Sequence, residues 1–269
     1  MAAPDFAIAR TPYRPYGSAI YRRELRVRSR EGAAVGELVD DFHHFRSSLY
    51  HDGARVTRAV GEAVRFPWTT CAGASLPLAR LAGMPLSPSL RAAARYTRWR
   101  DQCTHMFDAA SLAIVAAACG LRERRWQIAI PDRVRGRTRA TLACDGAPLL
   151  DWELDAGVIG GAPPFAGRRL AKGFADWAEA ELEPDLALAA LLLQRALVIS
   201  MGRSMDLERA ERASSLSTTP SDQCHTYQPG VAERGLRSLG SVRNWNDAAE
   251  LGAEFGRPAP PPPAGEERA

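Results

Sequence analysis

The order of strand-like and helix-like segments constrains the fold of this 269-residue chain more than any other feature. Runs rich in β-branched and aromatic residues come first, runs rich in alanine and leucine follow, and the same order then repeats. Strands that are grouped in this way are typical of meanders, in which neighbouring strands are antiparallel. The sequence therefore predicts an α+β fold in which antiparallel β-meanders pack against a small set of helices.

Short turns join the predicted strands into two groups. The strands are expected at residues 19–30, 33–39, 42–50 and 55–66, and again at 125–130, 137–144 and 149–154. Asp145-Gly146 is a strong hairpin signal, and residues 51–53 form a second glycine-containing turn. Helices are expected at residues 75–81, 87–98, 102–118, 172–182 and 184–201.

These elements place one core domain at residues 19–202. We expect an extended arm at residues 1–18 and a mobile polar segment at 203–222. Residues 223–250 are expected to be ordered and to pack on the core, and the proline-rich residues 251–269 to form a disordered tail.

Composition favours a soluble protein, because 46% of the residues are hydrophobic and 25% are charged. The longest apolar runs, 109–119 and 186–201, are too short for a bilayer or are interrupted by Gln194 and Arg195, so both are interpreted as core helices. Residues 1–5 carry no secretory pattern, which makes the cytoplasm the expected compartment. The five cysteines are irregularly spaced and form no CxxC pair, so a disulfide framework is not expected.

The net charge of +4 does not indicate a nucleic-acid partner. Lys172 is the only lysine, and the arginine clusters are interspersed with acidic residues, whereas phosphate-binding surfaces concentrate one sign of charge. The expected partner is a small molecule, with no nucleic acid and no membrane. A homo-oligomer is left open.

All five histidines lie beside carboxylates, a cysteine or both, which concentrates groups for proton transfer in a few short segments. If residues 41–51 form a regular strand, alternate side chains share one face. One face would then present Asp41, His43 and His51, and the other would present His44, Arg46 and Tyr50. The alternative is that these are half-exposed polar residues of a strand with no further role.

Cys103-Thr104-His105 precedes the apolar run of a helix. If Cys103 lies in the first turn, free backbone N–H groups and the helix dipole would favour its thiolate. Asp101 and Asp108 are spaced to share a helical face with His105 and to orient it. A buried structural cysteine is the alternative.

Three further residues are candidates for substrate binding. Trp68 and Cys71 lie in the junction between the first meander and the first helix, where loops often line sites. Arg203 follows a long helix and could pair with an acidic substrate or with Asp206.

Motifs for cofactors are absent from the sequence. It contains no HxxxH, HExxH, CxxC, GxGxxG, P-loop or GxSxG pattern, so nucleotide cofactors and serine hydrolysis have no support. No cofactor is expected. A zinc-type site assembled from His43, His51, Cys103 and His105 remains an alternative.

The His-rich meander, the junction at 67–74, Leu81-Ala82-Gly83-Met84-Pro85-Leu86 and the helix-opening Cys103-Thr104-His105 together resemble a bacterial family of unknown function, the one numbered 2889. The resemblance covers about residues 20–202, and Cys103-Thr104-His105 is its most specific element. Phe42-His43-His44-Phe45 is richer in histidine than the family pattern. The resemblance implies a role in the catabolism of aromatic compounds and a small phenolic substrate.

The leading hypothesis is a cofactor-independent lyase for a lignin-derived phenolic compound, which loses formaldehyde or has an ether bond opened by acid–base catalysis. The base would be His43 or His51, oriented by Asp41 or Asp52, and the acid would be His105 or Tyr50. Arg46 would stabilise developing charge on oxygen. The alternatives are a metal-dependent enzyme that uses the same residues, and a non-catalytic binding or assembly protein.

Overall fold

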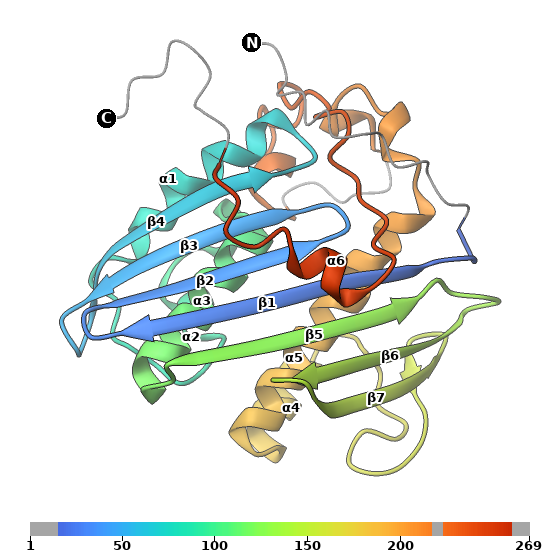
Figure 1. Ribbon diagram of the computed structural model, residues 1–269, viewed down its shortest axis with the longest axis horizontal. Coiled ribbons are helices and arrows are strands. Elements are labelled where there is room, and N and C mark those ends of the chain that lie inside the picture. Colours follow the sequence, from blue (N-terminus) through green and yellow to red (C-terminus); the bar gives the residue numbers. More distant parts are fainter. Residues whose placement is uncertain (1–15, 217–222, 260–269) are drawn as a thin grey trace.

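Eight strands form one antiparallel sheet in the order β4-β3-β2-β1-β5-β6-β7-β8 (Figure 1). The structure is a computed structural model that describes residues 16–216 and 223–259. The two expected meanders are halves of this one sheet, because β1 pairs with β2 on one side and with β5 on the other. With helices packed on the sheet, the α+β class is confirmed.

The strands are β1 (Ile20–Arg30), β2 (Ala33–Asp40), β3 (His44–His51), β4 (Val56–Arg65), β5 (Glu123–Pro131), β6 (Arg137–Cys144), β7 (Ala147–Asp155) and β8 (Val158–Ile159). The helices are α1 (Ser75–Leu78), α2 (Ala92–Tyr96), α3 (Thr104–Cys119), α4 (Phe174–Glu181), α5 (Pro184–Ser200) and α6 (Ala248–Gly252). Short 3₁₀ segments join several of them.

The two hairpin signals in the sequence are confirmed. Asp145 and Gly146 both have positive φ, 51° and 85°, as the favoured two-residue turn between twisted strands requires. Between β3 and β4, the Asp52 carboxylate accepts hydrogen bonds from the backbone N–H groups of Ala54 and Arg55 and so closes the turn.

Two helices cover one face of the sheet (Figure 1). Helix α3 packs on β1, β2 and β3, and α5 packs on β5, β6 and β7. The approach of α3 is closest at Gly36, where an added Cβ would lie 2.0 Å from the carbonyl oxygen of Ala109. A glycine at this position therefore lets the helix backbone lie directly on the strand.

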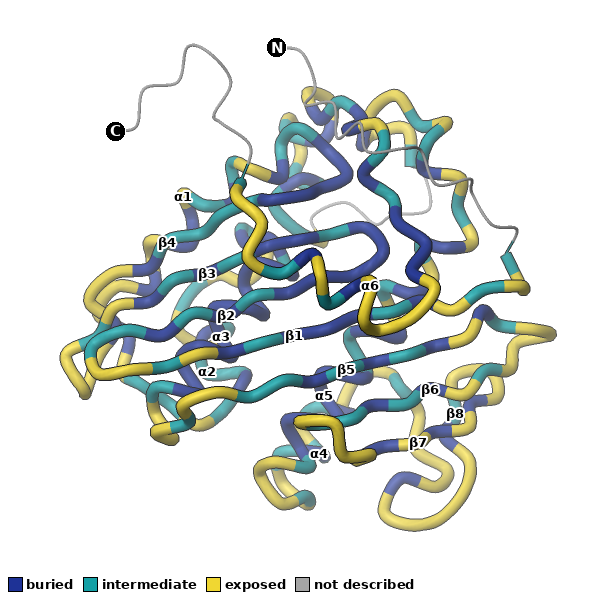
Figure 2. Tube along the Cα trace, viewed as in Figure 1, coloured by how far each residue is buried: buried dark blue, intermediate teal, exposed yellow. Residues whose placement is uncertain are grey.

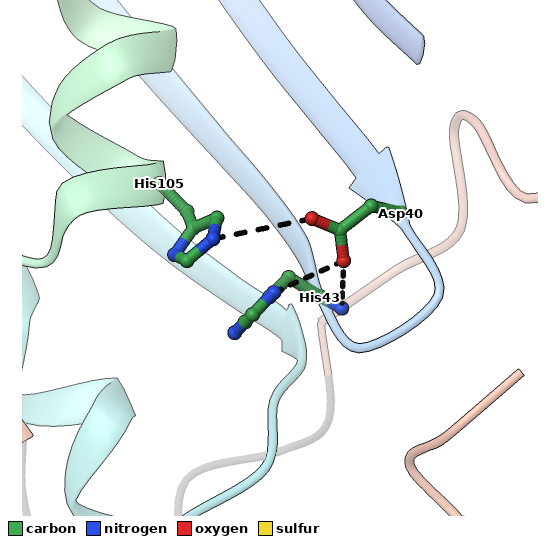
Figure 3. A group of neighbouring side chains, drawn as sticks. All are labelled: Asp40, His43 and His105. Carbon is green, nitrogen blue, oxygen red and sulfur yellow. Dashed lines mark hydrogen bonds and ion pairs between the residues drawn. The ribbon is translucent and has the colours of Figure 1, made fainter. Parts of the chain in front are cut away.

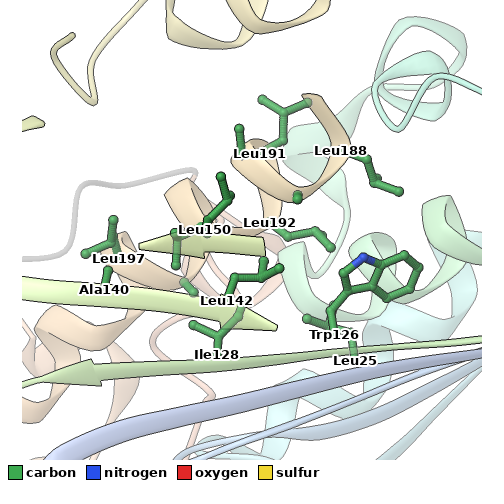
Figure 4. Packing of buried hydrophobic residues seen from close by; sticks show 14 of the residues in the cluster. Leu25, Trp126, Ile128, Ala140, Leu142, Leu150, Leu188, Leu191, Leu192 and Leu197 are labelled. Atoms are coloured by element: carbon green, nitrogen blue, oxygen red, sulfur yellow. The ribbon is translucent and has the colours of Figure 1, made fainter. Parts of the chain in front are cut away.

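Helix α5 is a core helix. It packs through leucines on Trp126, Ile128 and Leu142 of the sheet (Figure 4). Residues Pro184–Ser204 are long and apolar enough to cross a membrane by length and composition alone, but 56% of the apolar window is buried inside the protein. This burial is consistent with the core helix of a soluble fold.

The two helices expected before α3 are shorter in the structure than in the prediction. Residues 75–81 divide into α1 and a 3₁₀ turn, and of residues 87–98 only Ala92–Tyr96 is α-helical. The Ser87 hydroxyl accepts a hydrogen bond from Ser89 N, and the Ser89 hydroxyl accepts one from Arg91 N. Such local bonds from serine side chains compete with the helix and delay its start.

The C-terminal part of the chain folds back over the core. Residues 203–216, predicted to be mobile, form short 3₁₀ turns with Leu207 and Ala213 buried, and 217–222 lie outside the described residues. Helix α6 packs on β1 across the sheet from α3 and α5, and Leu251 is buried there although it lies in the predicted tail (Figures 1 and 2). Residues 1–15 of the predicted arm and 260–269 of the tail lie outside the description.

Candidate active site

A cavity of about 730 Å³ opens between α3, the C-terminal half of α5 and the segments around Trp68 and Cys224. Volumes of this size are typical of sites for small molecules. Six aromatic side chains line it: Phe42, Phe45, Trp68, Trp99, Phe107 and Tyr227. His43 and His105 lie in the same wall, so the cavity combines an apolar interior with two imidazoles.

Asp40 holds His43 in place (Figure 3). Strand β2 ends at Asp40, and the chain turns back so that Asp40 Oδ1 accepts hydrogen bonds from the backbone N–H groups of Phe42 and His43, each at 2.8 Å. The same oxygen lies 3.0 Å from His43 Nδ1. A carboxylate in this position fixes both the ring and its tautomer, with the proton on Nδ1.

The other oxygen of Asp40 accepts hydrogen bonds from two buried side chains of β1. Asp40 Oδ2 accepts hydrogen bonds from the Tyr21 hydroxyl at 2.8 Å and from Arg23 Nη2 at 2.7 Å. The β1–β2 register sets Arg23 opposite Asp40, and all three side chains are buried. Burial by itself would raise the pKa of Asp40, but the hydrogen bond from His43 and the positive charge of Arg23 outweigh it and hold that pKa well below its usual value.

His43 and His105 stack on each other with their ring centroids 3.6 Å apart (Figure 3). Burial lowers the pKa of His43 by more than Asp40 raises it. Burial, together with His43 and Arg23, holds the pKa of His105 well below 6.5. Both rings are therefore neutral near pH 7, and the pair disfavours a second proton because two like charges would then be in contact.

His43 and His105 differ in where the ring nitrogen without a hydrogen bond lies. Among the described residues no hydrogen bond reaches His43 Nε2, which in this tautomer is a proton acceptor at the cavity wall. His105 Nδ1 lies 3.2 Å from the Thr104 hydroxyl. Its Nε2 is buried without a hydrogen bond, 3.9 Å from Asp40 Oδ2. His43 is thus the better placed base.

The acids expected to orient His105 have other partners. Asp108 pairs with Arg195 of α5, and Asp101, which lies outside α3, pairs with Arg80. The carboxylate that faces His105 is Asp40, which comes from β2. Asp101 fails as a partner because α3 begins only at Thr104, and Asp108, although it lies on α3 with His105, is taken by Arg195.

For Cys103 the structure favours the alternative of a buried structural cysteine. Cys103 precedes α3 as its N-cap residue, and burial raises the pKa of its thiol well above the usual value, although backbone N–H groups of the helix lower it in part. Burial also raises the pKa of Cys71 to about 12. Both cysteines line the cavity as protonated thiols, and together with Trp68 they make this part of its wall apolar.

His51 and Tyr50 lie at the other end of β3 from this cavity. Eight strand residues separate the two ends by roughly 25 Å, so sharing a face does not bring His51 to His43. Tyr50 is 42% exposed and borders a smaller hollow of about 220 Å³ that contains no histidine. Neither residue lines the main cavity, which corrects the expectation that they act there with His43.

His44 and Arg46 face the opposite side of the sheet. His44 Nε2 lies 2.6 Å from Glu37 Oε1, and Arg46 bridges Glu37 and Glu62. The ring of Phe255 covers His44 there. These contacts anchor the C-terminal segment on the sheet, and neither residue lines the main cavity as expected of a substrate-binding group.

Asp41 also points away from His43. Its Oδ2 accepts a hydrogen bond from Arg203 at 2.7 Å, and Arg203 in turn bonds Asp132. Burial raises the pKa of Asp41 to about 7 against the opposing effect of Arg203. Asp41 and Arg203 therefore tie the turn after β2 to the segment after α5, and Asp40 takes the orienting role expected of Asp41.

Tyr21, Arg23 and Asp40 were not among the site residues predicted from the sequence. The arginine clusters were considered only for nucleic-acid binding, although Tyr21 and Arg23 share one face of a strand. A buried arginine beside a tyrosine in a predicted strand implies a buried acid nearby. The paired aspartates that precede the histidines were the available signal.

The ligand atoms of Asp40, His43 and His105 lie within 4.8 Å of one another, near enough to surround one metal ion. The hydrogen bonds of Asp40 fit such an ion poorly. Both of its oxygens already accept bonds from Arg23, Tyr21, His43 and the backbone. A metal would have to displace Arg23 or the His43 ring from a carboxylate that they satisfy.

No protein-family model, curated protein or solved structure matches this chain. The resemblance to family 2889 therefore stays a prediction.

Proposed function

We propose that this protein is a cofactor-independent lyase that acts on a small aromatic compound. The observation that carries the proposal is the neutral His43, which Asp40 orients at the wall of a cavity lined with aromatic side chains. An oriented neutral imidazole is suited to general base catalysis near pH 7.

The reaction that fits this arrangement is an elimination that starts from a hydroxymethyl group. His43 Nε2 takes the hydroxyl proton, and the carbon–carbon bond to that group breaks, releasing formaldehyde. The electron pair of that bond forms a carbon–carbon double bond and expels an aryloxide from the neighbouring carbon. The imidazolium of His43 then returns its proton to the aryloxide, so the net products are formaldehyde, an alkene and a phenol.

The surroundings of His43 favour both proton transfers. The negative charge of Asp40 stabilises the imidazolium as it forms. Burial lowers the pKa of His43, which makes the imidazolium a stronger acid towards the departing aryloxide. His105 stacks on the ring and positions it, and its neutral state keeps a second positive charge away.

The cavity supports an aromatic substrate. Its six aromatic side chains offer faces and edges for ring stacking, and the protonated Cys71 and Cys103 add apolar surface. A lignin-derived phenolic compound in a bacterial catabolic pathway, converted in the cytoplasm, is the substrate class that we propose. The similarity to family 2889 on Cys103-Thr104-His105 supports it.

A metal-dependent enzyme is the second candidate, because Asp40, His43 and His105 form a compact set of ligand atoms. Elemental analysis of protein purified without chelator separates the two. An equivalent of bound transition metal that is lost in His43→Gln would replace the acid–base proposal with this one.

Turnover of aryl ether dimers that carry a hydroxymethyl group tests the lyase directly. Released formaldehyde and phenol are measured together, since the mechanism requires them in equal amounts. His43→Gln should lower the rate by about 10²–10⁴-fold, the usual contribution of a general base. His51→Gln is the matched control, and it should turn over like the wild type because His51 lies outside the cavity. Equal rates in all three proteins would refute the role of His43.

A further inference from the structure

The wall of the main cavity contains an arginine with hydrogen-bond donors that the proposed reaction does not use. Arg195 of α5 reaches the cavity and pairs through Nη1 with Asp108 of α3. Among the described residues Asp108 is its only partner, so Nε and Nη2 have no acceptor. The side chain is 32% exposed, which leaves these donors open to a ligand.

The charges along this wall favour an anion. Four charged residues line the cavity, namely Arg23, Arg91, Arg195 and Asp108. The acids that balance Arg23 and Arg91 are Asp40, Asp176 and Glu179, and none of these lines the cavity. With His43 and His105 neutral, a ligand in the cavity thus faces three guanidinium groups and one carboxylate.

Arg195 is also close to the histidines along the helix. Asp108, which holds Arg195, lies three residues after His105 on α3. This spacing corresponds to a rise of about 4.5 Å and places both residues on one helical face. Because His43 stacks on His105 and Arg195 pairs with Asp108, Arg195 and His43 lie at neighbouring positions along α3 in the wall of one cavity.

We propose that Arg195 binds a carboxylate on the aromatic ligand of this cavity, so that the substrates are aromatic carboxylic acids. The planar guanidinium offers two parallel donors, Nε–H and Nη2–H, that match the two oxygens of a carboxylate. Asp108 keeps the guanidinium in place from the other side. This inference rests on the proposed function in one respect, that the cavity is the substrate site.

Binding without turnover tests the inference separately from the lyase reaction. The probes are 4-hydroxybenzoate and 4-phenoxybenzoate, each compared by calorimetry with the benzyl alcohol of the same skeleton. We expect the better acid to bind at least about tenfold more tightly than its alcohol. Asp108→Asn should strengthen the binding of the acid, because it removes the one carboxylate that lines the cavity and repels an anion.

The double variant Asp108→Asn with Arg195→Gln removes both charges and keeps both side chains polar, so no buried charge is left unpaired. It should lose most of the preference for the acid, because the paired donors of Arg195 are gone while Arg23 and Arg91 remain. Arg139→Gln, at an exposed ion pair on β6 and away from the cavity, is the matched control and should keep the preference.

The inference would be overturned by equal binding of acid and alcohol to the wild type, by a preference that is undiminished in the double variant, or by no binding of either acid at millimolar concentration. A clear preference for the acid in a protein that shows no lyase turnover would leave the inference standing and remove the proposed reaction.

Discussion

His105 should make the stability of this protein depend on pH in a measurable way. It is buried in the cavity wall, and burial together with His43 and Arg23 holds its pKa well below 6.5. In the unfolded chain the same ring takes up a proton below about pH 6.5. The unfolded state then binds more protons than the folded state, so the free energy of unfolding must decrease as the pH falls.

The size of this effect follows from the unfolded pKa. While folded His105 stays uncharged, each pH unit below 6.5 costs up to about 1.4 kcal/mol, and the loss reaches about 2 kcal/mol at about pH 5. His105→Gln cannot titrate and should avoid this loss. His43 would also titrate more easily without a second imidazole against it, which moves the variant in the same direction.

Urea denaturation at about pH 8 and at about pH 5 measures the difference. The variant is expected to be less stable at the higher pH, because it loses the stacking on His43, and to lose about 2 kcal/mol less than the wild type at the lower pH. The pH 8 comparison isolates the packing cost. If both proteins lose the same free energy between the two pH values, His105 is not held neutral by burial.

Three further perturbations test the fold and the site. Gly36→Ala should cost about 3 kcal/mol of unfolding free energy, because its Cβ meets the backbone of α3 at Ala109, and a fully stable variant would contradict that packing. Asp40→Asn should cost about 3–5 kcal/mol by leaving a buried arginine uncompensated. Asp151→Asn, at an exposed ion pair, should melt like the wild type. Turnover should rise with pH through the lowered pKa of His43 and level off below pH 6.5, so a midpoint above 6.5 would argue against this base.

The strands and hairpins were predictable because their signals are local. Alternating apolar residues and the Asp145-Gly146 turn specify β6 and β7 without reference to the rest of the chain. The union of the two meanders was not predictable, because Leu25 and Trp126 pair across about a hundred residues and leave no local pattern. The helix predicted at 87–98 is shortened to α2, because the Ser-Pro-Ser segment at 87–89 forms local hydrogen bonds that delay the start of the helix.

The candidate site was predictable in part. His43 and His105 were candidates from the clustering of histidines, and the structure brings them into contact. The choice of Asp41 over Asp40 failed because the β2–β3 ladder begins at His44, so His43 lies in the turn and faces the preceding carboxylate. Strand alternation cannot locate the point where a ladder begins. It also says which residues share a face but not how far apart they lie, and His51 is at the far end of β3 from His43.

The most direct test of the account is the protonation state of His43, measured by ¹⁵N NMR of the imidazole nitrogens across a pH titration. We expect a neutral ring at about pH 7 with its proton on Nδ1, facing Asp40, and with Nε2 unprotonated. The signal is assigned by its loss in His43→Gln. A ring that is charged at about pH 7, or that carries its proton on Nε2, would contradict the claim that this histidine is the base of the site.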